Sequence, residues 1–441
     1  MAVFGESNAA YRLAPFVCGV IAMAAMTLAL RAIAAEYSAL LGSLFLIFSP
    51  EAIAYSATLK QYSGELAVSA VLLLALARYL ERPSGRRYGL LAGLTTAALA
   101  LAYSTAFLVP GLALAVWLKP APERRRRALM LFALTGAALA AVYVFFVAPN
   151  VSPVLRNFWT APQQRLGPLS TAVVAVLGLH ALLPGAQWLL ENLWIWVIAL
   201  PLWTIPGFVL AAQHWRGGRR EPMILLAATA MPVALVAGAG GLAQYPVSER
   251  TNLFLLPMLI ALLMLSLTLI GERWRYVAVP SLALMAVGVG LAAAGNRTGV
   301  PADHEDSEAA VRYLQRNSQP GETIYVHASM AESFKLYRRI LGWEPVAVLA
   351  GDTGWPCCPR LERPLRGAST EQSVRRDLER LFPAGPRNVV WVLHTLRAAH
   401  WDYVGLDEST VIRDFLTGHA CHESPVPAVR NVAVRRYHCP A

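Results

Sequence analysis

The sequence predicts an α-helical polytopic membrane protein, a bundle of about ten transmembrane helices, followed by a soluble α/β domain at the C-terminus. Three observations support this fold class. Of the 441 residues, 56% are hydrophobic and only 15% are charged, which is too apolar for an ordinary soluble protein. Apolar runs near the spanning length of about 20 residues recur up to residue 295. From Thr298 onwards, charges become frequent and Pro, Gly and Asp separate shorter elements.

Eight apolar runs are each predicted to cross the membrane once, at residues 13–33, 38–56, 64–80, 128–148, 191–212, 222–242, 252–270 and 276–295. The run 88–118 is too long for one ordinary span, and Tyr103, Ser104 and Thr105 interrupt its middle. The positions of Lys and Arg indicate how many times this run crosses the membrane, because these residues favour cytoplasmic loops. Fourteen of them cluster in four loops, near residues 78–87, 119–127, 216–220 and 273–275. Two successive basic loops on one side require residues 88–118 to cross twice, as a hairpin that turns near Ser104.

An even number of crossings places Met1 and the segment after residue 296 on the same side, outside the cytoplasm. Residues 1–12 show no export signal. We therefore expect a further helix upstream of Met1 in the complete protein. A first helix that inserts unaided, with its N-terminus outside, is the alternative.

The composition change divides the chain into a transmembrane domain at residues 1–297 and an extracytoplasmic α/β domain at residues 298–441. In the second domain, helical spacing occurs in SEAAVRYLQRN, ESFKLYRRI and STVIRDFLTG, whereas ETIYVHA and RNVVWVLHT have the character of strands. This alternation predicts a small α/β sandwich whose strand order the sequence does not give.

Four of the five cysteines lie in the predicted extracytoplasmic domain, where disulfides are expected: Cys357, Cys358, Cys421 and Cys439. Adjacent cysteines pair poorly with each other. Two alternatives follow, either two bridges from Cys357 and Cys358 to the other pair or one bridge between Cys421 and Cys439. A zinc site with the nearby His419, His422 and His438 is a third alternative, although the spacing matches no strong zinc pattern.

Three predicted outer loops, at residues 50–63, 149–190 and 243–252, mix tyrosine, tryptophan, proline and isolated charges. Lys60 and Arg250 are the single cations of their loops, and tyrosines stand beside both: Tyr55, Tyr62 and Tyr245. Cations at membrane depth on the side that is poor in positive charge indicate a local anion, and a lipid phosphate is the nearest candidate. The alternative is that both side chains simply extend to water.

Glu51 and Glu65 border the first outer loop. A carboxylate there could act as a base, a metal ligand or a partner of an acceptor hydroxyl. The simpler interpretation is a charge in the first turn of a helix, because Glu51 follows Ser49 and Pro50, and Glu65 similarly opens the next apolar run.

The segment FSPEAIAYSATLKQYSGELAVSAVLLL resembles the second outer loop and following helix of the GT-C glycosyltransferases related to dolichyl-phosphate-mannose protein mannosyltransferases. Aminoarabinose lipid A transferases and rhizobial lipopolysaccharide transferases belong to the same group. The shared pattern is Ser-Pro, Tyr-Ser and a basic residue before Tyr. YPVSERTNLFLLPMLIALL is similar to the late outer loop of this family, and NFWTAPQQRLGP to part of its central loop. The resemblance extends over residues 5–295.

The resemblance implies transfer of a hexose or pentose from a polyprenyl-phosphate donor to a hydroxyl of a lipid, glycan or protein, at the outer face of a bacterial inner membrane. It implies that Lys60 and Arg250, with the three tyrosines, hold the donor phosphate. The catalytic residue stays unknown, since the family's first-loop Asp has no counterpart here, and Glu51 and Glu65 are weak candidates. Divalent ions assist some relatives, but the sequence has no ligand cluster for a metal.

Two other functions stay open at this point. Without the first-loop Asp, the chain could be an inactive scaffold that binds sugar-lipids. A transporter or flippase would also fit ten helices, but the sequence shows no internal repeat and its polar residues gather at one face. The absence of a glycine-rich phosphate loop argues against a nucleotide substrate. The net charge of +11 comes mostly from the loop arginines, so no nucleic-acid partner is needed to explain it.

Overall fold

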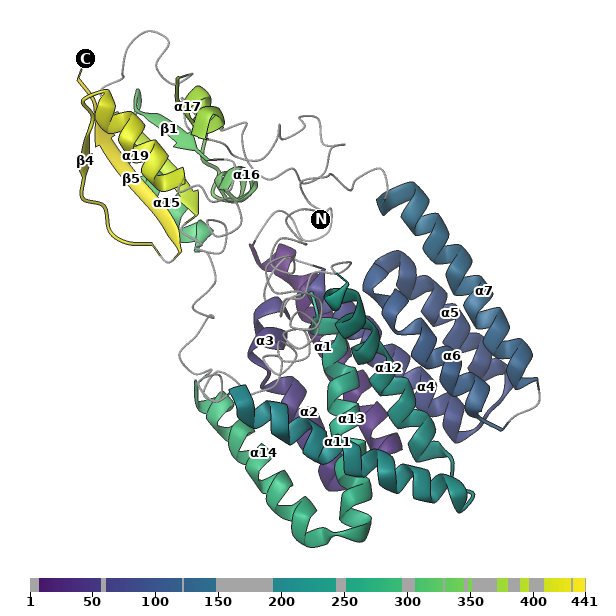
Figure 1. Cartoon of the computed structure of the whole chain (residues 1–441). Helices are drawn as coiled ribbons and strands as arrows, with labels where there is room; N and C mark the ends of the chain where they lie inside the picture. Colours follow the sequence, from purple (N-terminus) through teal and green to yellow (C-terminus); the bar gives the residue numbers. More distant parts are fainter. Residues whose placement is uncertain are drawn as a thin grey trace. The chain divides into compact units, whose positions relative to one another are not determined.

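A computed structural model describes residues 8–56, 61–120, 123–147, 193–242, 251–295, 306–327, 330–344, 348–350, 371–379, 389–395, 408–429 and 431–440 (Figure 1). The described elements form two compact units. Helices α1 to α14 belong to the first, which we call the helical unit, and the elements from α15 to β5 belong to the second, the α/β unit. Each is described by itself.

Apolar helices build the helical unit, and several begin at a capping side chain or a proline. Ser84 Oγ accepts the Arg87 N–H at 3.2 Å before α5, and Pro110 and Pro257 stand in the first turns of α6 and α13. The elements are α1 (Asn8–Ile33), α2 (Glu36–Ile47), α3 (Pro50–Ser56), α4 (Tyr62–Glu81), α5 (Gly85–Leu101), η1 (Tyr103–Phe107), α6 (Val109–Leu118), α7 (Arg124–Val142), η2 (Tyr143–Val147), α11 (Leu193–Arg216), α12 (Glu221–Gly241), η5 (Leu253–Leu255), α13 (Leu256–Arg273) and α14 (Arg275–Gly295).

The helix α13 lies at the centre of the helical unit (Figure 1) and packs against α2, α4, α11, α12 and α14. Apolar residues cover all its sides, as expected of a helix enclosed by other helices. In the segment Leu253–Arg273, 94% of the most apolar stretch is buried inside the structure. The corresponding share is 17% in Arg124–Phe145, which comprises α7 and the beginning of η2. The outer helices therefore present apolar side chains away from the unit, whereas α13 forms its core.

Five of the described helical segments are long and apolar enough to cross a membrane: Ala10–Ile33, Tyr62–Glu81, Arg124–Phe145, Glu221–Gly240 and Leu253–Arg273. The predicted total of ten crossings is not confirmed by this number. The run 88–118 is two helices, α5 and α6, joined at η1, which contains Ser104. The break in this run is where the sequence predicts it.

One predicted span has a different structure. The run 38–56 is not a single helix, because α2 ends at Ile47 and α3 begins at Pro50. Ser49 Oγ accepts the Ala52 N–H at 3.3 Å, which caps α3 and separates it from α2. With 12 residues and a rise of about 1.5 Å each, α2 alone is too short to span the hydrocarbon core.

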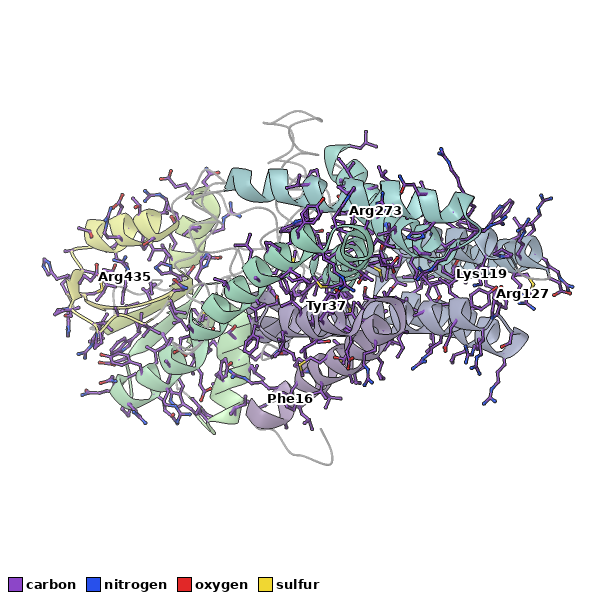
Figure 2. All side chains as sticks on the ribbon, turned by 90° about the horizontal axis from the view of Figure 1, so that it is seen from below. Phe16, Tyr37, Lys119, Arg127, Arg273 and Arg435 are labelled. Carbon is purple, nitrogen blue, oxygen red and sulfur yellow. A yellow bond between two sulfur atoms is a disulfide. The ribbon has the colours of Figure 1, made fainter. Side chains whose placement is uncertain are left out.

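The four basic loops of the helical unit are connected by polar contacts. Three contacts link them: the Tyr88 hydroxyl donates to the Arg127 carbonyl oxygen (2.7 Å), Lys119 Nζ pairs with Glu221 Oε1 (2.8 Å), and Arg219 Nη1 pairs with Glu272 Oε2 (3.4 Å). Lys119, Arg127 and Arg273 are labelled in Figure 2. The loops that the charge rule assigns to one side of the membrane thus meet at one end of the helical unit.

The α/β unit contains a five-stranded sheet in the order β2-β1-β3-β5-β4. The strands β2, β1 and β3 are parallel, with Ile324 opposite Trp391, whereas β3, β5 and β4 pair antiparallel. The elements are α15 (Ser307–Asn317), β1 (Thr323–Val326), α16 (Ala331–Ile340), β2 (Val348–Ala350), α17 (Glu371–Glu379), β3 (Val389–Thr395), α19 (Glu408–Gly418), β4 (His422–Ser424) and β5 (Val432–His438). All five segments predicted as helices or strands in this part have the predicted type.

Helices cover both faces of the sheet. On one face, Ala310 and Leu314 of α15 and Phe334 of α16 pack against a cluster that includes Trp391. On the other, apolar residues of α17 and α19 pack against a cluster that includes Tyr325. Alternate side chains of β1 and β3 therefore belong to two different cores, one on each face of the sheet. Both faces of these central strands are apolar because helices cover both.

Glu322, just before β1, receives three hydrogen bonds. The donors are Trp391 Nε1 (2.6 Å), Arg436 Nη2 (2.8 Å) and the Gln319 backbone N–H (2.9 Å), and the Arg436 guanidinium also lies 5.2 Å from the centre of the Trp391 ring. Burial works to raise the pKa of Glu322, but the hydrogen bonds from Trp391, Gln319 and Arg436 outweigh it and hold that pKa below its ordinary value. Glu322 therefore stabilises the start of the sheet as an anion.

We predict that Glu322→Gln destabilises the α/β unit by about 1–2 kcal/mol at neutral pH, because charge-assisted hydrogen bonds are replaced by weaker ones. A carboxylate whose pKa is lower in the folded than in the unfolded state stabilises the fold above the unfolded pKa, and this stabilisation is lost as the pH falls through the folded pKa. The difference in stability between Glu322→Gln and the unaltered protein should therefore become smaller once the pH falls below the ordinary pKa of 4.5. Hydrogen exchange of the peptide that contains β3, in the full chain in nanodiscs, measures this. Glu371→Gln, which breaks an exposed pair with Arg375, should change exchange little; equal effects of both variants would contradict the prediction.

Candidate functional site

The first outer loop brings two aromatic rings together between α3 and α4. The rings of Tyr55 and Tyr62 are in edge-to-face contact with their centres 5.0 Å apart. Lys60, the predicted phosphate ligand between them in sequence, lies outside the described residues, as do Tyr245 and Arg250 of the late outer loop. The structure therefore places two of the five predicted phosphate ligands, and it brings those two side by side.

Glu65 is the buried carboxylate of this region. It stands in the first turn of α4, as its position in the sequence predicts, but only 3% of its surface is exposed. Its side chain interacts with Gln61 and Ser104, and Tyr103 lies close enough to interact with it electrostatically. Since Tyr103 and Ser104 belong to η1, the turn between α5 and α6 closes over the beginning of α4.

Glu51 lies in the first turn of α3, where its carboxylate is half-buried and favourable to the helix dipole. Of the two candidate carboxylates, Glu65 is the one held inside the helical unit. Burial of a carboxylate is costly unless a cation or a ligand compensates it, and no described cation forms an ion pair with Glu65. Glu65 is therefore the stronger candidate for a chemical role.

An apolar cavity of about 650 Å³ lies along α4. Gln61, Ser63 and Gly64 border it at the start of α4, and it continues along that helix to Leu72, a length of about 16 Å at 1.5 Å per residue. Apolar residues of α1 and α5, including Cys18 and Leu101, form the other walls. The cavity thus has a polar border at one end and an apolar remainder.

A third segment reaches the same region. The helix η5 packs against α4, and the ring of Phe254 in η5 stacks on Phe107 of η1 with their centres 6.1 Å apart. Asn252 directly precedes η5, has 1% of its surface exposed, and finds no hydrogen-bond partner for either side-chain atom in the described part of the chain. An unpaired buried amide costs about 1–3 kcal/mol.

The sequence gives an incomplete prediction of this group of residues. Ser104 is predicted only as a turn, and Gln61, Tyr103 and Asn252 are given no role. A signal exists for all of them, since each is a polar residue at a break between apolar runs. Such positions come together only when the hairpin α5–α6 and η5 pack on α4, which the sequence does not reveal.

The cysteines of the α/β unit form one bridge, Cys421 to Cys439, with Cα atoms 4.1 Å apart. This is the single-bridge alternative, and it uses two thiols of the alternative zinc site. Cys357 and Cys358 lie outside the described residues. Within the ranges that the structure describes, no group of three or more His, Cys, Asp or Glu residues could hold a metal ion.

Comparison with known proteins tests the family resemblance that the outer-loop motifs predict. Residues 1–152, about a third of the chain, match the family described as dolichyl-phosphate-mannose-protein mannosyltransferase. In fold, the chain is similar to the crystal structure of ArnT from Cupriavidus metallidurans bound to undecaprenyl phosphate, with a TM-score of 0.51 and 14% identity over 99% of this chain and 85% of that one. The family match and the similar fold confirm the predicted resemblance to the GT-C glycosyltransferases. The GT-C proteins that the chain resembles are multi-pass membrane proteins.

Two further similarities are weaker. ArnT from Cupriavidus metallidurans in the apo state has a TM-score of 0.48 at 12% identity, over 96% of this chain and 83% of that one. The Archaeoglobus fulgidus oligosaccharyltransferase in complex with Zn and sulfate has a TM-score of 0.47 at 14% identity, over 87% of this chain and 56% of that one. No curated protein matches the chain in sequence.

We predict that Glu65→Gln raises the thermal stability of the protein, because the amide keeps the shape and hydrogen bonds of the side chain without the cost of a buried charge. An increase of about 1 kcal/mol in unfolding free energy is the expected size. Differential scanning fluorimetry in detergent measures it. The matched variant is Glu51→Gln at the half-buried carboxylate of α3, which should be neutral or slightly destabilising. A loss of stability in Glu65→Gln would show that the carboxylate has only a structural role.

Proposed function

We propose that this protein is a membrane glycosyltransferase that moves a sugar from a polyprenyl-phosphate donor to an acceptor hydroxyl at the extracytoplasmic face. The observation that supports this most directly is the cavity along α4, which is apolar over most of its length and polar at Gln61 and Ser63. A polyprenyl-phosphate sugar has the same division, with an apolar chain and a polar head. The similarity in fold to a protein that was crystallised with undecaprenyl phosphate supports the same donor class.

The polar end of the cavity would receive the head of the donor. Gln61 and Ser63 border the cavity there, and the residues between Ser56 and Gln61, which include Lys60, directly precede them in the chain. In this proposal Lys60 and Arg250 neutralise the donor phosphate, and Tyr55, Tyr62 and Tyr245 flank it. A cation that offsets the charge developing on a leaving phosphate contributes several kcal/mol to transition-state stabilisation.

The transfer step requires a base and a leaving group. The acceptor O–H gives its proton to a carboxylate, the acceptor oxygen bonds to the anomeric carbon, and the bond from that carbon to the phosphate oxygen breaks. Polyprenyl phosphate leaves with the electron pair, and attack from the opposite face inverts the configuration. Among the described residues, Glu65 is the candidate base, because it is a buried carboxylate whose side chain interacts with Gln61, and Gln61 borders the polar end of the cavity.

A donor dissolved in the membrane suits a site outside the cytoplasm, where nucleotide sugars are not supplied. We place the α/β unit, within the domain 298–441, on the same side. The disulfide between Cys421 and Cys439 supports this placement, because such bonds persist in oxidising compartments. The proposed location is a bacterial inner membrane with both the cavity mouth and the α/β unit facing outwards.

The donor assignment predicts that filling the cavity stops transfer. Gly64 borders the cavity and a Cβ atom there would meet nothing within 4 Å, so Gly64→Leu places a side chain in open space while improving helix propensity. We expect transfer of radiolabelled sugar from undecaprenyl phosphate to a membrane extract to fall by about tenfold or more, equivalent to about 1.4 kcal/mol of binding. Gly93→Leu is the matched control, since Gly93 of α5 also faces open space but does not line the cavity.

Two outcomes would contradict the donor assignment. One is equal transfer by both glycine variants. The other is an absence of transfer by the unaltered protein from every polyprenyl-phosphate sugar tested, which would leave lipid binding without catalysis. Lys60→Ala and Arg250→Ala should abolish transfer while expression is unchanged, and normal turnover in both would remove the proposed phosphate site.

The placement of the α/β unit predicts the oxidation state of its cysteines in cells. Cys421 and Cys439 should resist a membrane-impermeant maleimide until the cells are treated with a reductant, and then react from outside. The Cys421→Ser variant should expose the Cys439 thiol without reduction. If the reagent labels Cys439 only after the inner membrane is permeabilised, the unit faces the cytoplasm and the proposed orientation is wrong.

A further inference from the structure

Three buried residues in or just before η1 and η5, two segments that pack on α4, lack the side-chain hydrogen bonds that buried groups ordinarily make. Ser104 and Thr105 in η1 each have 1% of their surface exposed, and their hydroxyls have no regular hydrogen bond within the described ranges. The side-chain oxygen and nitrogen of Asn252 also have no hydrogen-bond partner within these ranges. Such groups are rare in folded proteins, and each calls for an explanation.

Other buried hydroxyls of the helical unit show what is unusual here. Thr95, Thr135 and Thr229 donate to the carbonyl oxygen four residues earlier, at 2.7, 2.6 and 2.8 Å. This bond is available inside a regular helix. Ser104 and Asn252 instead stand at breaks, where no such carbonyl is positioned to accept. Other unpaired hydroxyls in the described helical unit stand within helices and not at breaks: Ser38 in α2, Ser69 and Tyr79 in α4, and Ser266 in α13.

Ser104 and Asn252 belong to segments that both pack on α4. Ser104 lies beside the Glu65 carboxylate without regular hydrogen-bond geometry. Asn252 stands two residues before Phe254, whose ring stacks on Phe107, three residues after Ser104, and η5 packs on α4. Glu65, Ser104 and Asn252 thus belong to α4 and to two segments at its beginning, η1 and the residue before η5, both of which pack on α4. Gln61, which interacts with the Glu65 side chain, borders the polar end of the cavity.

The chemistry of these groups selects a class of ligand. A carboxylate accepts hydrogen bonds, a hydroxyl donates one and accepts two, and an amide does both. This set complements neighbouring hydroxyls, each of which also donates and accepts. It does not suit a phosphate, because the carboxylate would repel it and none of the three carries a positive charge. An apolar group would leave all of them unpaired.

We propose that Ser104 and Asn252, together with Glu65, form the subsite that binds the hydroxyl groups of the transferred sugar and determine which sugar is accepted. This inference rests on the proposed function, since it assumes a sugar attached to the lipid. The physical reason for discrimination is that a site built to pair with a hydroxyl rejects a ligand without it, because the buried polar groups of the protein are then left unpaired.

The test compares bare undecaprenyl phosphate with undecaprenyl phosphate that carries mannose, glucose, galactose or arabinose. Binding is measured by microscale thermophoresis with the full chain in nanodiscs. At least one sugar-bearing lipid should bind more tightly than the bare lipid. Asn252→Leu and Ser104→Ala should each reduce that advantage by about three- to tenfold, the effect of one hydrogen bond, and leave the affinity for the bare lipid unchanged. The control Ser38→Ala should change neither value.

A stability measurement separates recognition from a structural role. Replacing an unpaired buried amide by an apolar group of similar size removes a desolvation cost, so Asn252→Leu should raise the melting temperature while it weakens sugar binding. A lower melting temperature would instead mean that Asn252 holds the fold, and the proposal would be overturned.

The remaining outcomes are distinct. If all lipids bind with equal affinity to the unaltered protein, or if both variants keep the full preference for the sugar-bearing lipid, the subsite is elsewhere and the donor assignment survives. If neither the bare nor the sugar-bearing lipids bind, the proposed function itself fails, and this subsite fails with it.

Discussion

Close approach of helix backbones to α13 is the constraint on which the helical unit depends. Lipid provides no hydrophobic gain when two apolar helices meet, so small residues that permit close packing decide where they cross. A Cβ atom at Gly42 of α2 would lie 2.8 Å from Met264 Cγ, and one at Gly207 of α11 would lie 2.5 Å from Ser266 Oγ. Neither crossing has room for a side chain. Because α13 is enclosed in this way, the segment before it is held against α4, where the candidate site lies.

The two ends of the helical unit have different polar chemistry, and this difference organises its function. At one end, charged side chains satisfy each other, as Lys119 and Glu221 do at 2.8 Å. At the other, polar groups at helix breaks surround the buried Glu65 and are only partly satisfied. The first end is stabilised by ion pairs, whereas the second retains a cost in stability, because buried polar groups there have no partner in the described part of the chain. A retained cost of this kind is expected at a functional site.

Sequence patterns predict the elements well where a local signal defines each end. Ser104 marks the break in the run 88–118, and β1 and β3 follow the apolar pattern of their segments, whereas β4 (His422–Ser424) has no such pattern and is not predicted. The prediction of one span over 38–56 is wrong at the break after Ile47, although the helix start at Ser49, Pro50 and Glu51 is visible in the sequence, because the apolar run on both sides of it has the length of a span. The burial of Glu65 is equally hidden, since it depends on η1, which is distant in sequence. Sheet order is not predictable either, because the connections do not determine which strands become neighbours.

The edges of the sheet have a consequence for the solubility of the α/β unit. The outermost strands, β2 and β4, contain three residues each, whereas β3 and β5 in the interior contain seven each. A strand at an edge offers unpaired backbone groups on which another chain can add a strand, and a short one offers few of them. This architecture therefore protects densely crowded copies of the protein from joining edge to edge into aggregates.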